Sequence, residues 1–507
     1  MRGGADVSGA AWAALGGDAG LLEQVEYGGP AGLLAGRLPV MALARGSVAV
    51  CSLAAAEFAA RRWGGGVPRV RVDDGAVATA FVSERHLRVD GRAPVNFAPL
   101  SRFWAADGGW VRTHANYPHH RARLLAALGV ADGGAAGTGA GAADGVVERV
   151  ARELAKRRPE EIEEAVFAAG GLAVAVREPA EWAVGEQGRL VGGRPLLSLE
   201  RDGGAEDPRG SGVPSLRGLG VARLPAAGMR VLDLTRVISG PVATRTLALL
   251  GADVLRVDAP QLPESQDAHN DTGFGKRSVS LDLDRAADRR VFDELLGTAD
   301  VVVTGYRPGA LDRFGLDAAA LAERRPGLVI VRLSTWGEYG PWGGRRGFDS
   351  LVQAATGIAA LERAADGTPG VLPAQALDHG TGYLIAAAVL RALTERLDTG
   401  GTYTATFALA QTAHWLLTAE RPDTAAQPDT AERPQAAKRS EAAGPVGAYD
   451  DAPTPYDATP HLKETPSSQG LIRHARPPIT YDGSPTTWPA PPGPLGSDLP
   501  HWRQDAA

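Results

Sequence analysis

The sequence predicts an α/β fold in which helices cover both faces of a mostly parallel sheet. Three observations indicate this fold class. Short apolar runs alternate with runs of helical length between residues 225 and 418. The chain has 507 residues, which is enough for two to four domains. Its 44% hydrophobic and 22% charged residues are close to the globular average, which excludes whole-chain disorder, a coiled coil and a collagen-like fibre.

The first elements of this pattern form a strand–turn–helix–strand unit. Residues 229–234 are a short apolar run that predicts a buried strand. The turn TRVISGP (235–241) follows, and 242–252 predict a helix closed by Gly251. Residues 253–258 predict the second strand.

The same alternation continues along the chain. Residues 278–283 are strand-like, 289–296 predict a helix, and 300–304 and 328–333 predict two further strands separated by a helix. Such units imply right-handed crossovers and a parallel, doubly wound sheet. Ligands of these sheets bind beyond the carboxyl ends of the strands. The loops that fall there are TRVISGP, GYRPG (305–309) and STWGEYGP (334–341).

Charge and cysteine content exclude several classes of protein. The net charge of −6 does not suit a nucleic-acid binder. The single cysteine, Cys51, allows neither an internal disulfide nor a cysteine-based metal site, and its apolar surroundings favour a buried structural role. The N-terminus lacks an apolar signal core, and no run approaches ~20 uninterrupted apolar residues, so we expect a cytoplasmic protein without membrane contact.

Breaks in composition predict the domain organisation. A Gly/Ala run (131–145), a polar run (201–215) and a segment with a PDTA near-repeat from Glu420 interrupt the apolar pattern. We therefore expect a first block at 15–200 and a second at 225–418. A disordered linker is expected at 420–470, and a Pro-rich closing tail at 471–507 that docks again.

Several familiar site motifs are missing from the sequence. There is no GxGxxG, P-loop, HExxH or GxSxG, so nicotinamide dinucleotide, ATP, zincin and serine-hydrolase chemistry are unsupported. His114, His119 and His120 are a candidate metal cluster, but without a carboxylate at helical spacing a polar domain interface is favoured and no metal is expected.

One acid has an unusual setting. Asp378 precedes Gly380 and Gly382 at the start of a long apolar helix. On spacing alone it is an N-cap residue. Alternatively, helix-end amides hold its carboxylate ionised beside a bound thioester, so that it acts as a nucleophile.

A family resemblance rests on six motifs in order. They are VLDLTRVISGPVATRTLALLGADVLRVD, GKRSVSLDLD, ADVVVTGYRPGALDRFGL, STWGEYGPWGGRRGFDSLVQAATG, LDHGTGYLIAAAVLRAL and TGGTYTATFALAQ, between Arg230 and about Leu417. With them the chain resembles the class III CoA-transferases, the family of formyl-CoA and carnitine CoA-transferases and of α-methylacyl-CoA racemase. The resemblance implies a Rossmann-like CoA-binding domain at 225–418 and a smaller α+β domain.

The resemblance also implies a reaction that moves CoA between carboxylic acids. Asp378 would attack the donor thioester, and CoA would open the resulting anhydride to an aspartyl-CoA thioester. CoA and acyl-CoA are then substrates, with no metal or nicotinamide. By the same resemblance, the CoA groove is lined by Arg236, Ile238, Ser239, Leu281, Asp282, Leu283, Gly305, Tyr306, Arg307, Arg313, Arg346 and Phe348. Arg313 and Arg346 would contact CoA phosphates, the alternative for each being a solvated ion pair.

Some positions depart from the family pattern. Phe348 stands where the racemases have a histidine, which disfavours racemisation. The first loop has Ile238 and Ser239 in place of an amide or imidazole, and Ala259 replaces a basic residue. The glycine-rich loop of formyl-CoA transferases has no counterpart in 94–104.

The order of the family's parts is altered as well. Residues 94–130 and 151–189 resemble the later, smaller-domain part of a class III chain, yet they precede the CoA-binding half, and 475–498 resemble the family's closing segment. Two family chains thus look fused, and both a homodimer and an intramolecular equivalent of the family dimer remain open. Alternatives to CoA transfer are an acyl-CoA isomerase, racemase or dehydratase, favoured if Asp349 or a histidine of the first block faces the thioester, and a non-catalytic CoA-binding protein.

Overall fold

The computed structural model describes residues 3–95, 97–132, 140–202, 224–419 and 456–503. Its main sheet has seven strands in the order β10-β9-β8-β11-β12-β13-β7, and all but β7 run parallel. The bounds are β7 (Leu197–Asp202), β8 (Arg230–Leu234), β9 (Asp253–Asp258), β10 (Arg277–Ser280), β11 (Val301–Thr304), β12 (Val329–Ser334) and β13 (Thr402–Ala408). The strands expected from the sequence are all present.

The strand order reverses between β8 and β11. Counted from β8, the six parallel strands follow the order 3-2-1-4-5-6 of doubly wound folds. One boundary differs from expectation, because the run 278–283 is a strand only as far as Ser280. Beyond it, the Asp282 amide donates to the Asp288 carboxylate and turns the chain toward α12 (Ala286–Leu296).

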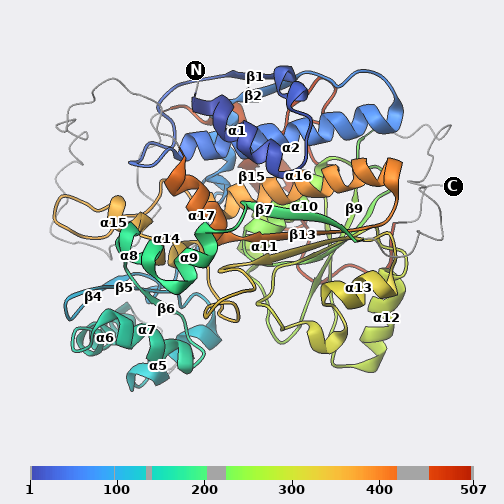
Figure 1. Ribbon diagram of the computed structural model, residues 1–507. Helices are drawn as coiled ribbons and strands as arrows, with labels where there is room; N and C mark the ends of the chain where they lie inside the picture. The colour runs from blue at the N-terminus through green and yellow to red at the C-terminus, as the bar shows by residue number, and fades with distance from the viewer. Residues whose placement is uncertain (1–2, 96, 133–139, 203–223, 420–455, 504–507) are drawn as a thin grey trace.

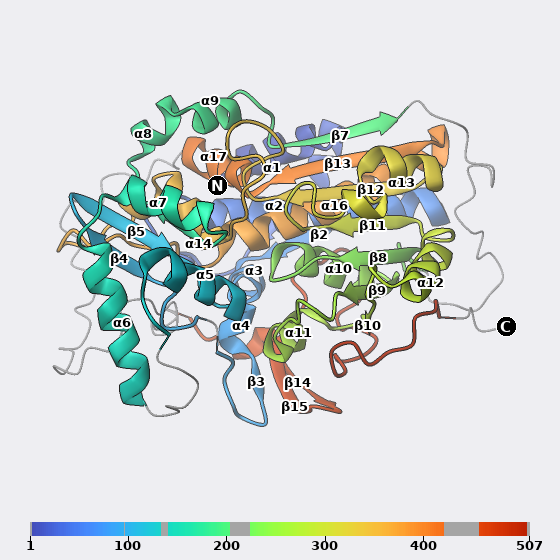
Figure 2. The same cartoon turned by 90° about the horizontal axis from the view of Figure 1, so that it is seen from below.

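Alternate residues of the strands pack into two separate cores. Val231, Val301 and Val329 face α10 (Ser239–Leu249) and α16 (Ala376–Thr399). Leu232, Val302 and Ile330 face α12 and α13 (Ala318–Arg324). Figures 1 and 2 show the two pairs of helices on opposite sides of the sheet. Both faces are therefore buried, which explains why the strands lack a polar alternation.

The N-terminal segment packs on the main domain instead of on the smaller one. Helix α2 (Val40–Trp63) lies along α16 and shares its core, and α1 (Gly3–Ala14) covers α2 (Figure 1). By length and composition α2 is the one helix of the described residues that could cross a membrane, and 78% of its most apolar window is buried inside the molecule. The rest of the segment is η1 (Ala19–Gln24), β1 (Val25–Gly28), β2 (Val70–Asp73), α3 (Asp74–Ala80), α4 (Ser83–His86) and β3 (Arg88–Val89).

A smaller α+β unit follows. Its antiparallel sheet consists of β4 (Phe103–Ala106), β5 (Gly109–Thr113) and β6 (Ala173–Ala175). Its helices are α5 (Pro118–Leu128), α6 (Ala140–Leu154) and α7 (Pro159–Ala168), and they enclose a core of their own. Helices α8 (Pro179–Val184) and α9 (Glu186–Gly192) then lead to β7, which pairs with β13. The expected block at 15–200 is thus divided among the main domain, the smaller unit and an edge strand.

The end of the chain returns to the main domain. Strands β14 (Leu462–Ser467) and β15 (Gly470–Ala475) pair with β3. Farther on, the Asp498 amide donates to Ser278 at the β10 edge, which agrees with a docked tail. The expected disordered linker is wrong for 456–470, because β14 forms ladder hydrogen bonds there. Residues 420–455 lie outside the described residues.

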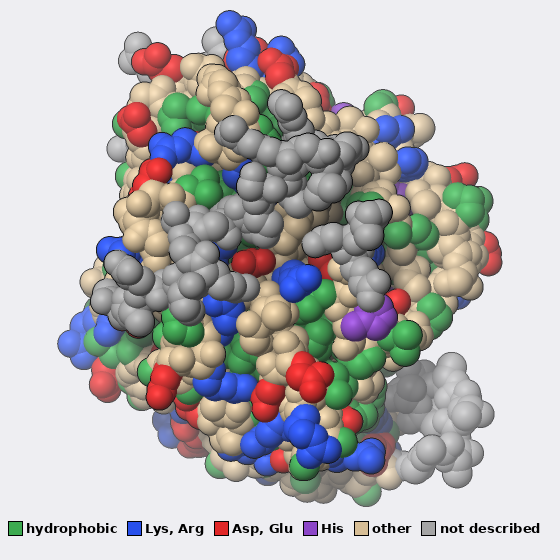
Figure 3. All heavy atoms as spheres, turned by 90° about the vertical axis from the view of Figure 1, so that its right-hand side faces the viewer, with side chains coloured by type: hydrophobic (Ala, Val, Ile, Leu, Met, Phe, Trp, Pro, Cys, Tyr) green, Lys and Arg blue, Asp and Glu red, His purple; other side chains and the backbone are tan. Residues whose placement is uncertain are grey.

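The remaining elements are η2 (Asp312–Phe314), η3 (Thr459–His461), α11 (Gln266–Thr272), α14 (Asp349–Ala355), α15 (Ile358–Leu361) and α17 (Leu409–Thr418). On the face drawn in Figure 3, acidic and basic side chains are interspersed.

Candidate active site

The loop after β8 lies at the point where the strand order reverses. Val237 has a φ of 70°, a conformation that strains a β-branched residue. Glu264 holds the loop, because its carboxylate accepts the Val237 amide at 3.2 Å and lies 3.5 Å from the Arg236 guanidinium. The Tyr117 hydroxyl of the smaller unit donates to the same carboxylate at 2.9 Å. Glu264 therefore ties this loop to the smaller unit.

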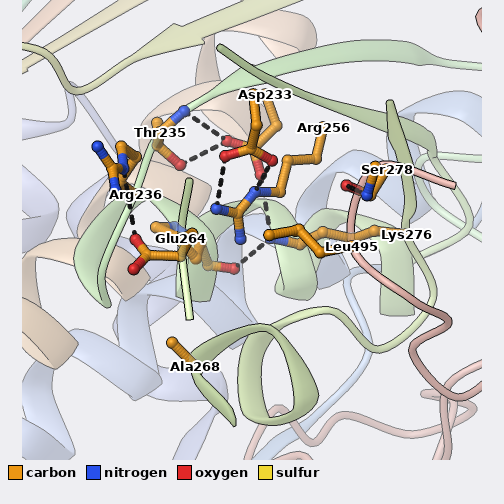
Figure 4. Close-up of polar contacts among 12 residues, drawn as sticks. Asp233, Thr235, Arg236, Arg256, Glu264, Ala268, Lys276, Ser278 and Leu495 are labelled. Atoms are coloured by element: carbon orange, nitrogen blue, oxygen red, sulfur yellow. Dashed lines mark hydrogen bonds and ion pairs between the residues drawn. The ribbon is translucent and has the colours of Figure 1, made fainter. Parts of the chain in front are cut away.

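A buried ionic network supports the loop from below (Figure 4). The Lys276 Nζ donates to Asp233 Oδ2 at 3.0 Å and to the Pro241 carbonyl at 2.8 Å, and both charged side chains are fully buried. Burial lowers the pKa of Lys276 to about 8. Burial raises the pKa of Asp233, but the charges of Lys276 and Arg256 outweigh it and leave that pKa below its usual value. The network fixes the end of β8 to the first turn of α10.

The first turn of α10 carries a buried hydroxyl. Ser239 is 2% exposed, and its Oγ has no hydrogen-bond partner among the described residues. Ile238 precedes it as the N-cap residue and packs against the core. Of Ile238 and Ser239, only Ser239 has a polar side-chain atom to offer a ligand.

The loop after β11 lies directly beside the first loop. The Gly305 amide donates to the Leu234 carbonyl, and a Cβ on Gly305 would come 3.4 Å from Thr235. Burial raises the pKa of Tyr306 to about 12. Arg307 is exposed. The expected residues after β8 and β11 are therefore brought together.

Residues after β10 contribute differently. The Leu281 side chain is buried in the core beneath α12, and Leu283 packs against the same core. The Asp282 carboxylate accepts the Asp284 amide. Arg313 is 64% exposed and pairs with Asp284 at 2.8 Å. In this structure Arg313 thus forms the solvated ion pair that was the alternative to a phosphate contact.

Asp378 lies in the first turn of α16 and is 5% exposed. It is not the N-cap residue, since that position is Gln375. The hypothesis that helix-end amides hold its carboxylate ionised is wrong, because the Leu377 and Asp378 amides both donate to Asp349 Oδ2 at 3.0 Å. Burial and the nearby Asp349 and Glu84 raise the pKa of Asp378 well above its usual range. The carboxyl accepts no hydrogen bond from the described residues.

Asp349 begins α14 and is completely buried. Its Oδ2 accepts the two α16 amides, and its Oδ1 accepts a hydrogen bond from Gln353 Nε2. Burial raises the pKa of Asp349 to about 6, although these hydrogen bonds act in the opposite direction. The carboxylate therefore anchors α16 to α14.

The face of α16 that carries Asp378 meets the start of α10. Gly382 lies one turn after Asp378 on the same face. A Cβ on Gly382 would come 2.6 Å from the Ser239 carbonyl oxygen and 2.9 Å from Val242 Cβ. The glycine allows the two helices to approach, and Asp378 is thereby placed near the first loop.

The loop before α14 meets the smaller unit. The Phe348 ring stacks on His114 with centroids 3.7 Å apart and planes 8° apart, and lies 5.9 Å from His120. Both histidines are 4% exposed, and the Nδ1 of each has no partner among the described residues. Burial lowers the pKa of His114 well below its usual range and that of His120 to about 3. The histidines thus form an interface, as the alternative to metal binding predicted.

Arg346 is a half-buried cation in the same loop. No carboxylate of the described residues lies within ion-pair distance of its guanidinium. Burial lowers the pKa of Arg346, and the nearby Arg307 and Arg123 lower it further. An unpaired arginine near other arginines suits an oxyanion.

No group of three or more His, Cys, Asp or Glu side chains that could hold a metal occurs within the described part of the chain. Cys51 is completely buried in α2, and burial raises the pKa of its thiol. This setting is the buried structural one expected from its apolar surroundings.

Sequence reasoning missed several residues around the site. Glu264, Tyr117 and Glu84 come from segments whose contacts with the main domain are long-range, so no local pattern marked them. Lys276 lies within the GKRSVSLDLD motif, but the sequence did not show that this lysine is buried under the first loop.

Comparisons with known proteins found a family model and several relatives that match parts of this chain. Residues 226–456 match the model of CoA-transferase family III. The acetyl-coenzyme A transferase nodX of Hypoxylon pulicicidum is 34% identical over 48% of this chain and 42% of its own. The acyl-CoA transferase of Gibberella moniliformis is 32% identical over 61% of this chain and 55% of its own. The formyl-CoA:oxalate CoA-transferase of Streptomyces coelicolor is 35% identical over 34% of this chain and 45% of its own.

The chain spans about half the length of the curated relatives it matches. Among solved structures, a CAIB/BAIF family protein from Brucella suis is 28% identical, covers 39% of this chain and 59% of its own, and has a TM-score of 0.35.

Proposed function

Because residues 226–456 match the model of CoA-transferase family III, we propose that the chain is a class III CoA-transferase that transfers CoA between carboxylic acids with Asp378 as nucleophile. The relatives are named as transferases of acetyl-CoA, of acyl-CoA, and between formyl-CoA and oxalate. These names support CoA thioesters and carboxylic acids as the two substrate classes.

One observation carries the proposal. Asp378 is buried one turn before Gly382, the residue that meets the Ser239 carbonyl of the first loop, and its carboxyl accepts no hydrogen bond from the described residues. A structural carboxylate at this depth would be paired or hydrogen-bonded. A carboxyl without a hydrogen-bond partner suits a group that forms a covalent bond with a substrate.

The proposed reaction begins when a carboxylate oxygen of Asp378 attacks the thioester carbonyl carbon. The C–S bond breaks and CoA leaves as a thiolate, so the acyl group is held as a mixed anhydride. The thiolate then attacks the carboxyl carbon of Asp378, which releases the donor acid as a carboxylate and leaves an aspartyl-CoA thioester. An acceptor carboxylate reverses these two steps.

Two nearby side chains have roles in this proposal. The Ser239 hydroxyl is a buried donor without a partner among the described residues, so it can donate to the oxygen that gains charge during attack. Arg346 can hold a phosphate of CoA, because no carboxylate of the described residues pairs with it.

Intact-protein mass spectrometry after incubation with a panel of short acyl-CoAs tests the proposal. We expect an adduct of acyl or CoA mass that hydroxylamine removes and that peptide mapping places on the Asp378 peptide. The identity of the donor that gives the adduct also names the acyl group.

Asp378→Asn is the matched variant. It keeps the shape of the side chain but removes the nucleophilic carboxylate, so the adduct should disappear while CoA affinity, measured by calorimetry, changes by no more than a few-fold. An adduct retained by this variant would show that another residue is the nucleophile. CoA binding without an adduct from any donor would favour a non-catalytic CoA-binding protein.

A second candidate, an acyl-CoA isomerase, is favoured by the stack of His114 on Phe348. The stack places His114, a histidine of the first block, against Phe348, the residue that precedes Asp349. Against it, both Asp349 oxygens already accept hydrogen bonds. Exchange of the α-proton of a bound acyl-CoA with D₂O, followed by NMR, separates the two, because CoA transfer needs no such exchange.

A further inference from the structure

Three acids from distant parts of the chain meet at the start of α16. Asp378 belongs to α16 itself, Asp349 to α14 and Glu84 to α4. Asp349 Oδ2 lies 3.0 Å from the Asp378 amide nitrogen, and Glu84 Oε2 lies 3.4 Å from Nε2 of the next residue, His379. Together with burial, these two acids raise the pKa of Asp378. A carboxylate so placed is destabilised both by burial and by two like charges.

Glu84 comes from the N-terminal segment, which lies outside the family match at 226–456. Its Oε2 is 3.4 Å from His379 Nε2, and the Phe81 ring packs 5.4 Å from the His379 ring. The Arg85 guanidinium donates to the Pro373 carbonyl at 2.7 Å, which ties α4 to the segment before α16. Glu84 is therefore held beside the residue that follows the nucleophile.

Asp349 is held on the other side. Two α16 amides and the Gln353 side chain occupy its oxygens, so its carboxylate cannot turn away from Asp378. Since the Asp378 amide is one of these donors, the two acids are joined through a single hydrogen bond to the nucleophile's own backbone.

The surroundings of the three acids contain few compensating charges. His379 faces Glu84, and Arg85 lies 3.9 Å from Glu84. No cation of the described residues forms an ion pair with Asp378 or Asp349. Within the described part of the chain, no ion pair thus neutralises a negative charge on Asp378.

We propose that Asp349 and Glu84 are positioning residues that destabilise the Asp378 carboxylate relative to its uncharged acylated forms. The inference rests on the proposed function, because it concerns the same nucleophile. It also gives the N-terminal segment a part in the reaction.

The charge balance of the covalent steps explains the effect. When the Asp378 oxygen bonds to the acyl carbon and the C–S bond breaks, the negative charge passes from Asp378 to the CoA thiolate. In the anhydride and in the aspartyl-CoA thioester the Asp378 side chain is neutral. Repulsion from Asp349 and Glu84 therefore disappears on acylation. The two charges raise the equilibrium constant for acylation of the ionised protein by the same factor by which they lower the ionisation constant of Asp378.

Glu84→Gln tests the proposal with two readouts. Subtracting the infrared spectrum of Asp378→Asn isolates the band of the protonated Asp378 carboxyl. The intensity of this band can be followed as a function of pH, and the measurement does not require enzyme activity. We expect the midpoint to fall by at least half a pH unit. Mass spectrometry is done at a fixed ratio of acyl-CoA to CoA and at a pH above the wild-type midpoint. The ratio of acylated to free protein should then be at least threefold lower in Glu84→Gln than in wild type. One pH unit corresponds to tenfold.

Glu395→Gln is the matched control. Glu395 also pairs with a cation, Arg391, but it lies 17 residues along the same helix, about 25 Å away. It should change neither readout. The double variant Asp349→Asn with Gln353→Glu moves the second charge one turn along α14, while the hydrogen bond between these two side chains keeps a donor and an acceptor. It should shift the midpoint in the same direction as Glu84→Gln.

The two failures are distinguishable. An unchanged midpoint and acylation ratio in Glu84→Gln would overturn the inference and leave the nucleophile assignment intact. If wild-type protein forms no adduct with any donor, the proposed function fails, whereas the infrared midpoint still decides whether Glu84 acts on Asp378.

Discussion

At the scale of single residues, the site is defined by groups that have no partner. The Asp378 carboxyl, the Ser239 hydroxyl and the Arg346 guanidinium lie at the ends of different elements, and each lacks a hydrogen-bonded or ionic partner among the described residues. By contrast, both oxygens of Asp349 accept hydrogen bonds, and Arg313 forms an ion pair with Asp284. This contrast, which the sequence cannot show, separates ligand-binding groups from structural ones.

The two candidate phosphate-binding arginines should therefore differ in their effect on CoA affinity. Arg346→Ala should weaken CoA binding by about 1–3 kcal/mol, the value of a charged hydrogen bond, because this cation gives up no protein partner on binding. Arg313→Ala should weaken it by less, since Arg313 is exposed and must leave Asp284. Calorimetric titration with CoA measures both. Equal losses of CoA affinity in the two variants would show that the Arg313–Asp284 ion pair breaks without a cost in free energy.

At the scale of elements, the position of α16 depends on close approach to its neighbours. Gly380 faces α2, where a Cβ would come 2.6 Å from Leu43 Cδ2, and Gly382 faces α10. Both glycines follow Asp378 within one turn. The sequence showed the glycines, but only the packing shows that each is a contact point between α16 and a neighbouring helix and so helps to place Asp378.

Gly382→Val should consequently destabilise the protein. Its side chain would overlap the Ser239 carbonyl and Val242, and overpacking of this kind costs about 1–3 kcal/mol. Gly9→Ala in α1 is the control, because a Cβ there meets nothing within 4 Å and alanine favours a helix by about 1 kcal/mol. Urea denaturation followed by circular dichroism measures both. A neutral Gly382→Val would mean that α10 and α16 can separate freely.

At the scale of the whole molecule, three parts of the chain share the main domain. The N-terminal segment covers α16, the C-terminal strands pair with β3, and β7 adds an antiparallel edge to the sheet. The smaller unit contacts the site through Tyr117 and His114. Unfolding any one of these parts should therefore disturb the site.

Acid should unfold this assembly partly through buried neutral histidines. His269 is 1% exposed, and burial lowers its pKa to about 3. The unfolded chain binds a proton below the usual pKa of 6.5 that the folded chain does not, so stability is lost as the pH falls from 6.5 toward 3. Between pH 7 and pH 5, wild type should lose about 2 kcal/mol more than His269→Gln in urea denaturation. Parallel pH curves for the two proteins would contradict this assignment.

The sequence by itself determined the strands of the main sheet and the three loops that follow them, because apolar periodicity is a local property. Through the resemblance of its motifs to a known family, it also led to the proposal that Asp378 is the nucleophile. It could not determine that 462–467 is a strand of a small sheet with β15 and β3, or that α2 belongs to the main domain, because both depend on contacts with residues far away in the chain. Only the tertiary structure showed the surroundings of the Asp378 carboxyl. Asp349 takes the helix amides that were expected to stabilise Asp378, and Glu84 arrives from the N-terminal segment. Ionisation of a buried acid depends on the charges that surround it in space, and these come here from three separate regions of the chain.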